Sequence, residues 1–344
     1  MPVLKNVFCF KTSLIAMAMF FCFSLNAQRF DSVLERLDTQ YPQEKLYLQF
    51  DRSIYNAGET IWFKAYLFSG ISLSLISKTM YAELVDDKGN IIQRITTPVI
   101  RSGAASSFDI PATITGERVY VRAYTKWMLN FDSSFLYIKA FPLITKTAAV
   151  IKTAAISTTY LQFFPEGGDM VQGLLSRVAF KATDEHGIPV AVQGDIVDAT
   201  GKKITAFTSI HDGMGTFTLT PAGTERYKAV WKDHGQLRET FLPSAKKEGI
   251  VLEVNNIGNQ INFTVTRSMD TSSSNSEITI VGQFQQQLIY RAKARLAAGG
   301  NLNATIPVDS LPGGITQITV FNKDEQPLAE RIVCINQQGY YFIT

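Results

Sequence analysis

The residues best suited to bind a metal ion are few in this chain of 344 residues. Its three histidines, His186, His211 and His234, each stand beside a glycine or an aspartate in a predicted hairpin turn. A zinc site needs three or four converging ligands. His211 and Asp212 together supply two, and no other residue with ligand spacing accompanies them. We therefore expect solvated turn residues and no metal site.

No sequence motif supports a catalytic function. A Ser-His-Asp triad is defined by geometry, but the sequence has no Gly-x-Ser-x-Gly elbow and no α/β pattern to carry one. Residues 86–90 and 166–169 contain side chains whose oxygen atoms could bind calcium. Their order is not that of an EF-hand loop. The Gly-Gly pairs at 167–168 and 313–314 precede no predicted helix, so they form no phosphate-binding loop. We expect no enzyme activity and no cofactor, with a structural calcium ion as the alternative for these loops.

The N-terminus is typical of a secretory signal peptide covering residues 1–27. Lys5 and Lys11 supply the positive charge before an apolar run at residues 14–25. We expect cleavage between Ala27 and Gln28.

Two other interpretations of this segment are less favoured. A membrane anchor needs about 20 apolar residues, and Lys11 interrupts the run. A lipoprotein at Cys22 would need small residues before it, whereas Met19, Phe20 and Phe21 stand there. We expect no transmembrane segment after removal of the signal peptide.

Composition and charge exclude several classes of protein. Hydrophobic residues make up 46% of the chain and charged residues 18%, which is typical of a globular protein and not of a disordered chain or a coiled coil. The net charge of +3 falls to +1 without Lys5 and Lys11, because 31 basic residues then face 30 acidic ones. A chain so close to neutral lacks the electrostatic signature of a nucleic-acid-binding protein.

The cysteines indicate export without disulfides. Cys9 and Cys22 lie in the predicted signal peptide, which leaves Cys334 alone. One cysteine forms no internal bridge. Since Cys334 stands in the apolar run 331–335, we expect it to be buried and inert.

A short helix and many short strands make up the rest of the chain. Residues 28–38 carry apolar side chains at i, i+3, i+4 and i+7, and Pro42 ends the helical segment, which we place at 28–42. Runs rich in β-branched and aromatic residues follow, separated by turns that pair polar residues with glycine. The expected strands are 45–50, 61–68, 79–85, 91–95, 117–124 and 135–141, then 161–164, 177–183, 194–198, 204–209, 215–220, 227–232 and 237–242, and finally 250–254, 260–266, 277–284, 287–292, 301–306, 315–321 and 329–335.

Short strands at regular spacing are typical of β-sandwiches. We expect an all-β fold in which tandem immunoglobulin-like sandwiches follow the short N-terminal helix. The expected sandwiches are residues 43–143, 160–246 and 247–344, with a linker at 144–159.

One motif lies in residues 45–68, KLYLQFDRSIYNAGETIWFKAYLF. Asp51 is followed by Tyr55, then by Gly58 and Glu59, and then by an alternating strand. This pattern resembles the alpha-2-macroglobulin-type (MG) domain family. We expect Gly58 to occupy a turn at positive φ, which glycine adopts without strain.

A second motif begins with FFPEGG at residues 163–168 and continues with RVAFKA at 177–182 and DGMGTF at 212–217. It resembles macroglobulin-like modules of Bacteroidetes cell-envelope proteins, which often precede a TonB-receptor plug domain. LPGGITQIT at 311–319 and LAERIV at 328–333 are similar to the same proteins. The residues that carry the second motif are Phe164, Pro165, Glu166, Gly167 and Gly168, together with Asp212, Gly213 and Gly215.

The chain departs from protease-trapping macroglobulins at the thioester. That motif is Cys-Gly-Glu-Gln in a helical domain, whereas residues 334–337 read Cys-Ile-Asn-Gln on a predicted strand end. We expect no functional thioester. No plug domain fits before Thr344, so the chain resembles the front portion of a longer architecture.

The resemblance implies an exported, non-enzymatic envelope scaffold or interaction protein, in the periplasm, at the outer membrane or on the cell surface. Its implied partners are outer-membrane receptors of the TonB type or a protease. A protease-inhibitor-like protein is the first alternative, with residues 145–159 or 270–276 as a cleavable segment.

A carbohydrate-binding module is the second alternative. Trp62 and Tyr66 share one strand face, as do Tyr120 and Tyr124 on another strand. Such rings either stack on sugars or pack between domain faces. Exposed aromatic residues would favour sugar binding, and buried ones would exclude it.

Overall fold

The computed structural model describes residues 29–144, 158–185, 187–223, 226–257, 260–270, 272–309, 311 and 313–336. The predicted signal peptide with its cleavage site, Ala27 and Gln28, lies outside these residues, as does most of the predicted linker at 144–159. Among the described helices, none has the length and apolar character needed to span a bilayer.

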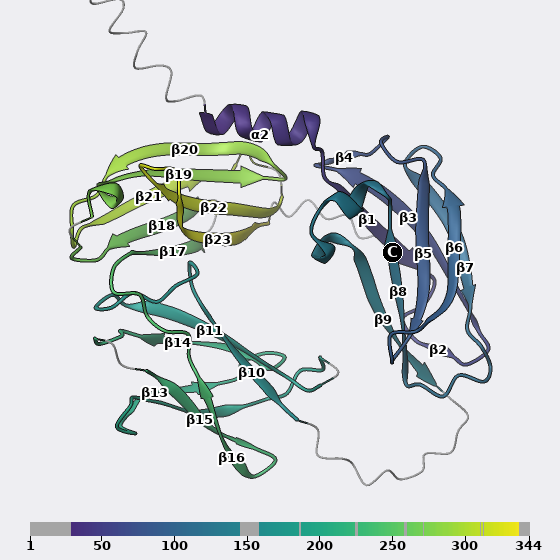
Figure 1. The fold of residues 1–344 in the computed structure, drawn as a ribbon, viewed down its shortest axis with the longest axis horizontal. Helices are drawn as coiled ribbons and strands as arrows, with labels where there is room; N and C mark the ends of the chain where they lie inside the picture. Colours follow the sequence, from purple (N-terminus) through teal and green to yellow (C-terminus); the bar gives the residue numbers. More distant parts are fainter. Residues whose placement is uncertain are drawn as a thin grey trace, which may run out of the picture. The chain divides into compact units, whose positions relative to one another are not determined.

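The first of two compact units, Met1–Ile151, contains helix α2 (Arg29–Gln40) and one sandwich of two sheets (Figure 1). One sheet contains β1 (Glu44–Phe50), β3 (Thr60–Ser69), β4 (Ser72–Leu73) and β7 (Gly103–Asp109). The other contains β2 (Tyr55–Asn56), β5 (Thr79–Asp86), β6 (Ile91–Pro98), β8 (Arg118–Tyr124) and β9 (Tyr137–Ile144), and the short 3-10 helices η1 (Trp127–Asn130) and η2 (Ser133–Phe135) lie between β8 and β9.

The second unit, Lys152–Thr344, contains two further sandwiches (Figure 1). Its first sandwich consists of β10 (Tyr160–Pro165), β11 (Ser176–Thr183), β12 (Gln193–Val197), β13 (Lys203–Thr208), β14 (Met214–Leu219), β15 (Lys228–Asp233) and β16 (Gln236–Phe241). Its second sandwich consists of β17 (Ile250–Ile257), β18 (Gln260–Arg267), β19 (Glu277–Phe284), β20 (Gln287–Arg295), β21 (Asn301–Pro307), β22 (Gly314–Asn322) and β23 (Pro327–Ile335), with the 3-10 helix η3 (Ser273–Ser276).

All three sandwiches have the same strand order once the two-residue strands β2 and β4 are set aside. The first, second and fifth strands form one sheet, and the fourth, third, sixth and seventh form the other, as in β10-β11-β14 and β13-β12-β15-β16. In the described residues, the pairing between these strands is antiparallel throughout. The predicted fold class is therefore confirmed: an all-β chain of tandem immunoglobulin-like sandwiches follows a short helix.

Each sandwich buries its own cluster of side chains between its two sheets. The alternation that defines a half-buried strand places Val119, Val121 and Ala123 of β8 in the first core, as predicted. The second core gathers Phe163, Phe180, Phe207, Phe217 and Trp231. The third core is mainly aliphatic, with Leu252, Ile261, Val265, Ile280 and Val320.

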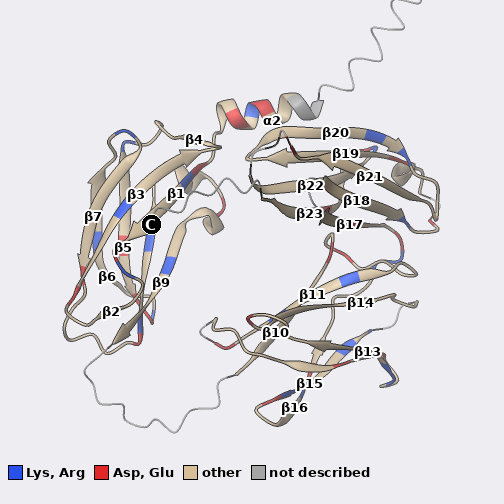
Figure 2. Ribbon diagram, turned by 180° about the vertical axis from the view of Figure 1, so that it is seen from behind, with Lys and Arg blue, Asp and Glu red and all other residues tan. Residues whose placement is uncertain are grey.

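Charged residues are interspersed along the strands of each sandwich (Figure 2). This distribution fits the near-neutral balance of the chain.

The strand predictions missed the two-residue strands β2 and β4 and the longer strand β7, and they misplaced Cys334. Strand β7 was not predicted, because Gly103, Ala104, Ala105, Ser106 and Ser107 have weak strand propensity. It forms because it pairs with β3 along its whole length.

Cys334 lies on the expected strand but is exposed, not buried. Because side chains alternate along a strand, the burial of its neighbour Ile335 turns Cys334 outward.

Gly58 has a φ of +87°, which confirms the predicted turn. We expect Gly58→Val to destabilise the first sandwich by about 1–3 kcal/mol, because a β-branched residue is strained at positive φ. Chemical denaturation measures the change. Ala57→Val, which places the same side chain at ordinary φ in the neighbouring position, is the control. Equal stability of the two variants would contradict the assignment.

Candidate functional site

The first sequence motif forms a corner at the end of β1. Asp51 Oδ1 accepts hydrogen bonds from the Tyr55 hydroxyl at 2.6 Å and from the Trp62 amide at 3.0 Å. The Tyr55 ring is fully buried and packs edge-on against Phe141, with 5.5 Å between ring centroids. The corner therefore ties the start of β3 to the core.

Both hydrogen-bonded groups of this corner have shifted pKa values. Burial raises the pKa of the Tyr55 hydroxyl, and its hydrogen bond to Asp51 raises it further. Burial alone would raise the pKa of Asp51, but hydrogen bonds from Tyr55 and Trp62 outweigh that effect and lower it. A phenol that stays protonated and a carboxylate that stays ionised make a stable structural pair.

Glu59 completes the turn that Gly58 begins. Its carboxylate accepts hydrogen bonds from the Asn56 amide at 2.8 Å, from the Asn56 side chain at 3.0 Å and from Arg52 at 3.1 Å. The hydrogen bonds that Asn56 donates are the largest cause of the lowered pKa of Glu59, and the charge of Arg52 lowers this pKa further. The carboxylates of Asp51 and Glu59 thus stabilise the backbone around Gly58.

We expect Tyr55→Phe to destabilise the first sandwich by about 1.5–3 kcal/mol, because it removes a hydrogen bond to a charged group and keeps the ring. Thermal and urea unfolding report the change. Tyr47→Phe, which removes a hydroxyl from an exposed ring of the same sandwich, should unfold like the wild type. A Tyr55→Phe protein as stable as the Tyr47→Phe protein would show that the corner contributes nothing.

The part of the second motif around Glu166 lies where the two sandwiches of the second unit meet. Glu166, directly after β10, is buried, and its carboxylate pairs with Arg331 of β23 at 3.0 Å and with Arg177 of β11 at 3.5 Å. Arg177 also contacts Glu253 of β17 at 3.3 Å. We call these four charged residues, Glu166, Arg177, Glu253 and Arg331, the junction cluster. It combines two residues from each sandwich.

The backbone next to Glu166 also crosses the junction. The Gly167 carbonyl accepts a hydrogen bond from the Glu330 amide at 3.0 Å. Gly167 has a φ of +85°, and a Cβ there would lie 3.3 Å from the Leu252 carbonyl oxygen, so glycine suits both the turn and the close approach. Parallel bridging between Val171 and Lys246 adds a further tie within this unit.

Ion pairs with Arg177 and Arg331 balance the charge of Glu166. Among the described residues, hydrogen bonds of good geometry do not contribute. Neither carboxylate oxygen has a hydrogen-bond partner in the described part of the chain. A cavity of about 60 Å³ lies beside it, lined in part by Glu166, Arg177 and Leu252. A cavity of this size accommodates water, which would supply the missing hydrogen bonds.

The other residues of the second motif lie in turns and strands of the same sandwich. Asp212 and Gly213 form the turn before β14 with φ values of +44° and +70°, and a Cβ on Gly213 would lie 2.3 Å from the Ala182 carbonyl oxygen. Gly215 leaves room for the Phe180 ring, which a Cβ would approach to 2.7 Å. Phe164 is exposed, Pro165 ends β10, and the Gly168 amide donates to the Pro165 carbonyl at 3.0 Å.

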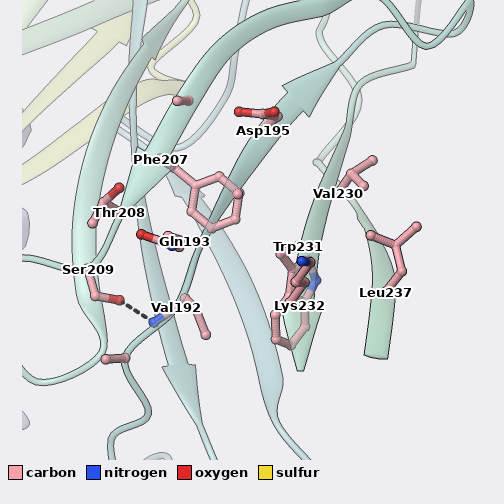
Figure 3. Close-up of a pocket in the computed structure, with 13 residues that line it drawn as sticks. Val192, Gln193, Asp195, Phe207, Thr208, Ser209, Val230, Trp231, Lys232 and Leu237 are labelled. Carbon is pink, nitrogen blue, oxygen red and sulfur yellow. Dashed lines mark hydrogen bonds between the residues drawn. The ribbon is translucent and has the colours of Figure 1, made fainter. Parts of the chain in front are cut away.

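A hollow of about 730 Å³ lies on the sheet β13-β12-β15-β16, and no sequence signal pointed to it (Figure 3). The strand register places Asp195 beside Ala206 and Val230. The neighbours of Asp195 on this sheet are therefore small and apolar. Asp195 pairs with Lys203 at 2.7 Å, and the Val192 amide donates to Ser209 Oγ at 3.0 Å. The titratable residues that line the hollow are Asp195 and Lys232.

The histidines form no metal site in the described part of the chain. His211 and His234 are exposed in turns, as predicted, and His186 lies outside the described residues. Within the described part of the chain, no cluster of His, Cys, Asp and Glu is arranged to hold a metal ion.

Most of the first expected cleavable segment, residues 145–157, lies outside the residues that the structure describes. The loop at 270–276 is anchored at its start, because buried Asp270 accepts hydrogen bonds from Arg267, from Ser268 Oγ at 3.0 Å and from the Ser272 amide at 3.1 Å. Its hydrogen bond from Arg267 is the largest cause of a lowered pKa.

No family model matches the sequence, and no curated protein matches it. The solved structures to which the chain is similar include alpha-2-macroglobulins, the family that the motifs resemble. Native Escherichia coli alpha-2-macroglobulin is 9% identical over 84% of this chain and 22% of its own length, with a TM-score of 0.26. The Salmonella protein reacted with methylamine is 10% identical over 85% of this chain and 23% of its own, with a TM-score of 0.27.

The BSP domain of a biofilm-associated protein is 11% identical over 85% of this chain and 66% of its own, with a TM-score of 0.27. The chain spans about a fifth of the length of the macroglobulins. At such TM-scores these likenesses say nothing about activity, and the fold rests on the strand pairing described above.

The arginines of the junction cluster were missed as functional residues. Glu166 was singled out in its motif, and Arg177 and Arg331 stand within the quoted stretches RVAFKA and LAERIV. A buried glutamate needs an ion-pair partner or hydrogen-bond donors, but the sequence does not say which residues supply them.

We expect Arg331→Ala to destabilise the second unit by about 1–3 kcal/mol, because it leaves the buried Glu166 charge with Arg177 alone. Arg295→Ala is the control, since its pair with Glu277 is exposed and should contribute at most about 0.5 kcal/mol. Urea unfolding of both variants, and of Glu166→Gln alone and combined with Arg331→Ala, completes a double-mutant cycle. Additive effects of the two substitutions would show that the residues are not coupled.

Proposed function

We propose that this protein is an exported, non-enzymatic scaffold of the cell envelope, and that the two sandwiches of its second unit form a rigid interaction module. The junction cluster is the observation that carries this proposal. It joins two sandwiches through a buried carboxylate, which requires its arginine partners at fixed positions, because an unpaired buried charge is costly. A stiff pair of sandwiches is suited to holding binding surfaces at a set spacing.

The arrangement of the motif residues supports a structural role for them. Asp51, Glu59 and Glu166 direct their carboxylates at the chain's own amides, hydroxyls and arginines. A general acid or base must reach a substrate proton, and these groups are engaged within the fold. This favours a scaffold over an enzyme.

We further propose that the partner is outer-membrane receptor machinery of the TonB type. The support is the resemblance of the second motif to modules of envelope proteins that often precede a plug domain. An exported location follows from the signal peptide predicted at residues 1–27.

A cross-linked affinity purification from the cell envelope tests the proposal. The tagged chain should be recovered in the envelope fraction with Gln28 at its N-terminus, together with outer-membrane receptors or their accessory proteins. Arg331→Ala should capture less of the same partners if the stiffness of the junction matters, and Arg295→Ala should capture as much as the wild type.

Two outcomes would overturn it. Recovery in the cytoplasm with an intact N-terminus would refute export. Recovery of a protease bound to a chain cut within residues 145–159 or 270–276 would identify the inhibitor-like alternative instead.

A further inference from the structure

The outer face of the sheet β1-β3-β7 carries exposed aromatic rings. Along β3, Ile61, Phe63 and Ala65 point into the core, so Trp62, Lys64 and Tyr66 point outward. Register places Tyr47 of β1 opposite Tyr66 and Gln49 opposite Lys64. We call Tyr47, Trp62, Lys64 and Tyr66 the aromatic face.

These rings are accessible to solvent. Trp62 is 60% exposed and Tyr47 is 56% exposed, and Tyr66 is partly exposed. The Tyr47 and Tyr66 rings lie 6.5 Å apart between centroids, with an interplanar angle of 31°. Packing within the sandwich does not explain them, because the core lies on the opposite side of the strand.

The neighbouring strand β7 leaves this face open. Its residues opposite Trp62, Lys64 and Tyr66 are Ser107, Ala105 and Gly103. Paired residues share a face of the sheet, and these side chains are small. The rings therefore border a shallow surface on which a flat ligand can lie.

Lys64 places a positive charge between the rings. Its ammonium lies 5.1 Å from the Tyr66 ring centroid, on the ring face. Within the described part of the chain, no carboxylate forms an ion pair with Lys64. The face therefore combines stacking surfaces with one cation that has no acidic partner.

We propose that the aromatic face binds an acidic polysaccharide, with uronic acid as the charged sugar. The C–H bonds on one side of a pyranose ring form an apolar surface that stacks on an aromatic ring. The carboxylate of a uronic acid complements Lys64, and Gln49 and Ser107 offer hydrogen bonds to hydroxyl groups.

Other occupants fit this face less well. The centres of protein interfaces are depleted in lysine, and here a lysine lies among the rings. A single-stranded nucleic acid needs a groove of several cations along its backbone, whereas the chain as a whole is nearly neutral. This binding role goes beyond the scaffold function and does not depend on the TonB-type partner.

Titration calorimetry of the purified protein with tetragalacturonate and with tetramannuronate tests the proposal. At least one acidic tetramer should bind, and binding should weaken as salt is raised, since screening reduces the attraction to Lys64. The neutral tetramer of galactose, which keeps the ring and lacks the carboxylate, should bind about tenfold more weakly or not at all.

Variants separate the two parts of the site. Trp62→Ala should lower the affinity for the acidic tetramer about tenfold through lost stacking. Lys64→Gln should lower it similarly and remove most of its salt dependence. Tyr160→Ala, which removes an exposed ring from β10, is the matched control and should bind like the wild type. Thermal unfolding of each variant verifies that it is folded.

The proposal fails if neither acidic tetramer binds, or if the neutral tetramer binds as tightly as the acidic one. It also fails if folded Trp62→Ala and Lys64→Gln proteins bind as tightly as the wild type.

Discussion

The removal of the Glu166 carboxylate from water is the constraint on which the second unit depends. Burial of an ionised group costs several kcal/mol unless opposite charges compensate it. Here the compensating arginines come from both sandwiches, Arg177 from one and Arg331 from the other. Sliding one sandwich along the other would separate Arg331 from Glu166. The same charge that is costly to bury therefore defines how the two sandwiches of this unit meet.

Buried carboxylates also connect distant segments of the first sandwich, with different partners. Glu44 is fully buried and accepts hydrogen bonds from the hydroxyls of Ser74, Ser77 and Thr125, which join β1 to segments far along the chain. Burial alone would raise the pKa of Glu83, but hydrogen bonds from Arg122 and Arg94 lower it. Each such acid is satisfied by the fold itself, which accords with a chain whose polar groups serve architecture.

Sandwiches with the same strand order present different surfaces in this chain. The first presents Trp62, Lys64 and Tyr66 on the face of one sheet, whereas the first sandwich of the second unit has a hollow around Asp195 and Val230. Strand order is determined by the buried faces, and outward residues vary without disturbing it. The repeated architecture is thus compatible with more than one binding role along a single chain.

Local patterns were sufficient to predict the fold class, most strands and the Gly58 turn, because alternation and turn chemistry act between near neighbours. It missed β7, whose alanines and serines become a strand only by pairing with β3. It misplaced Cys334, because nearly every residue around it is apolar and the phase of the alternation was unreadable. The pairing of Arg331 with Glu166 could not be predicted, since that contact depends on how two sandwiches meet, and no local interaction encodes it.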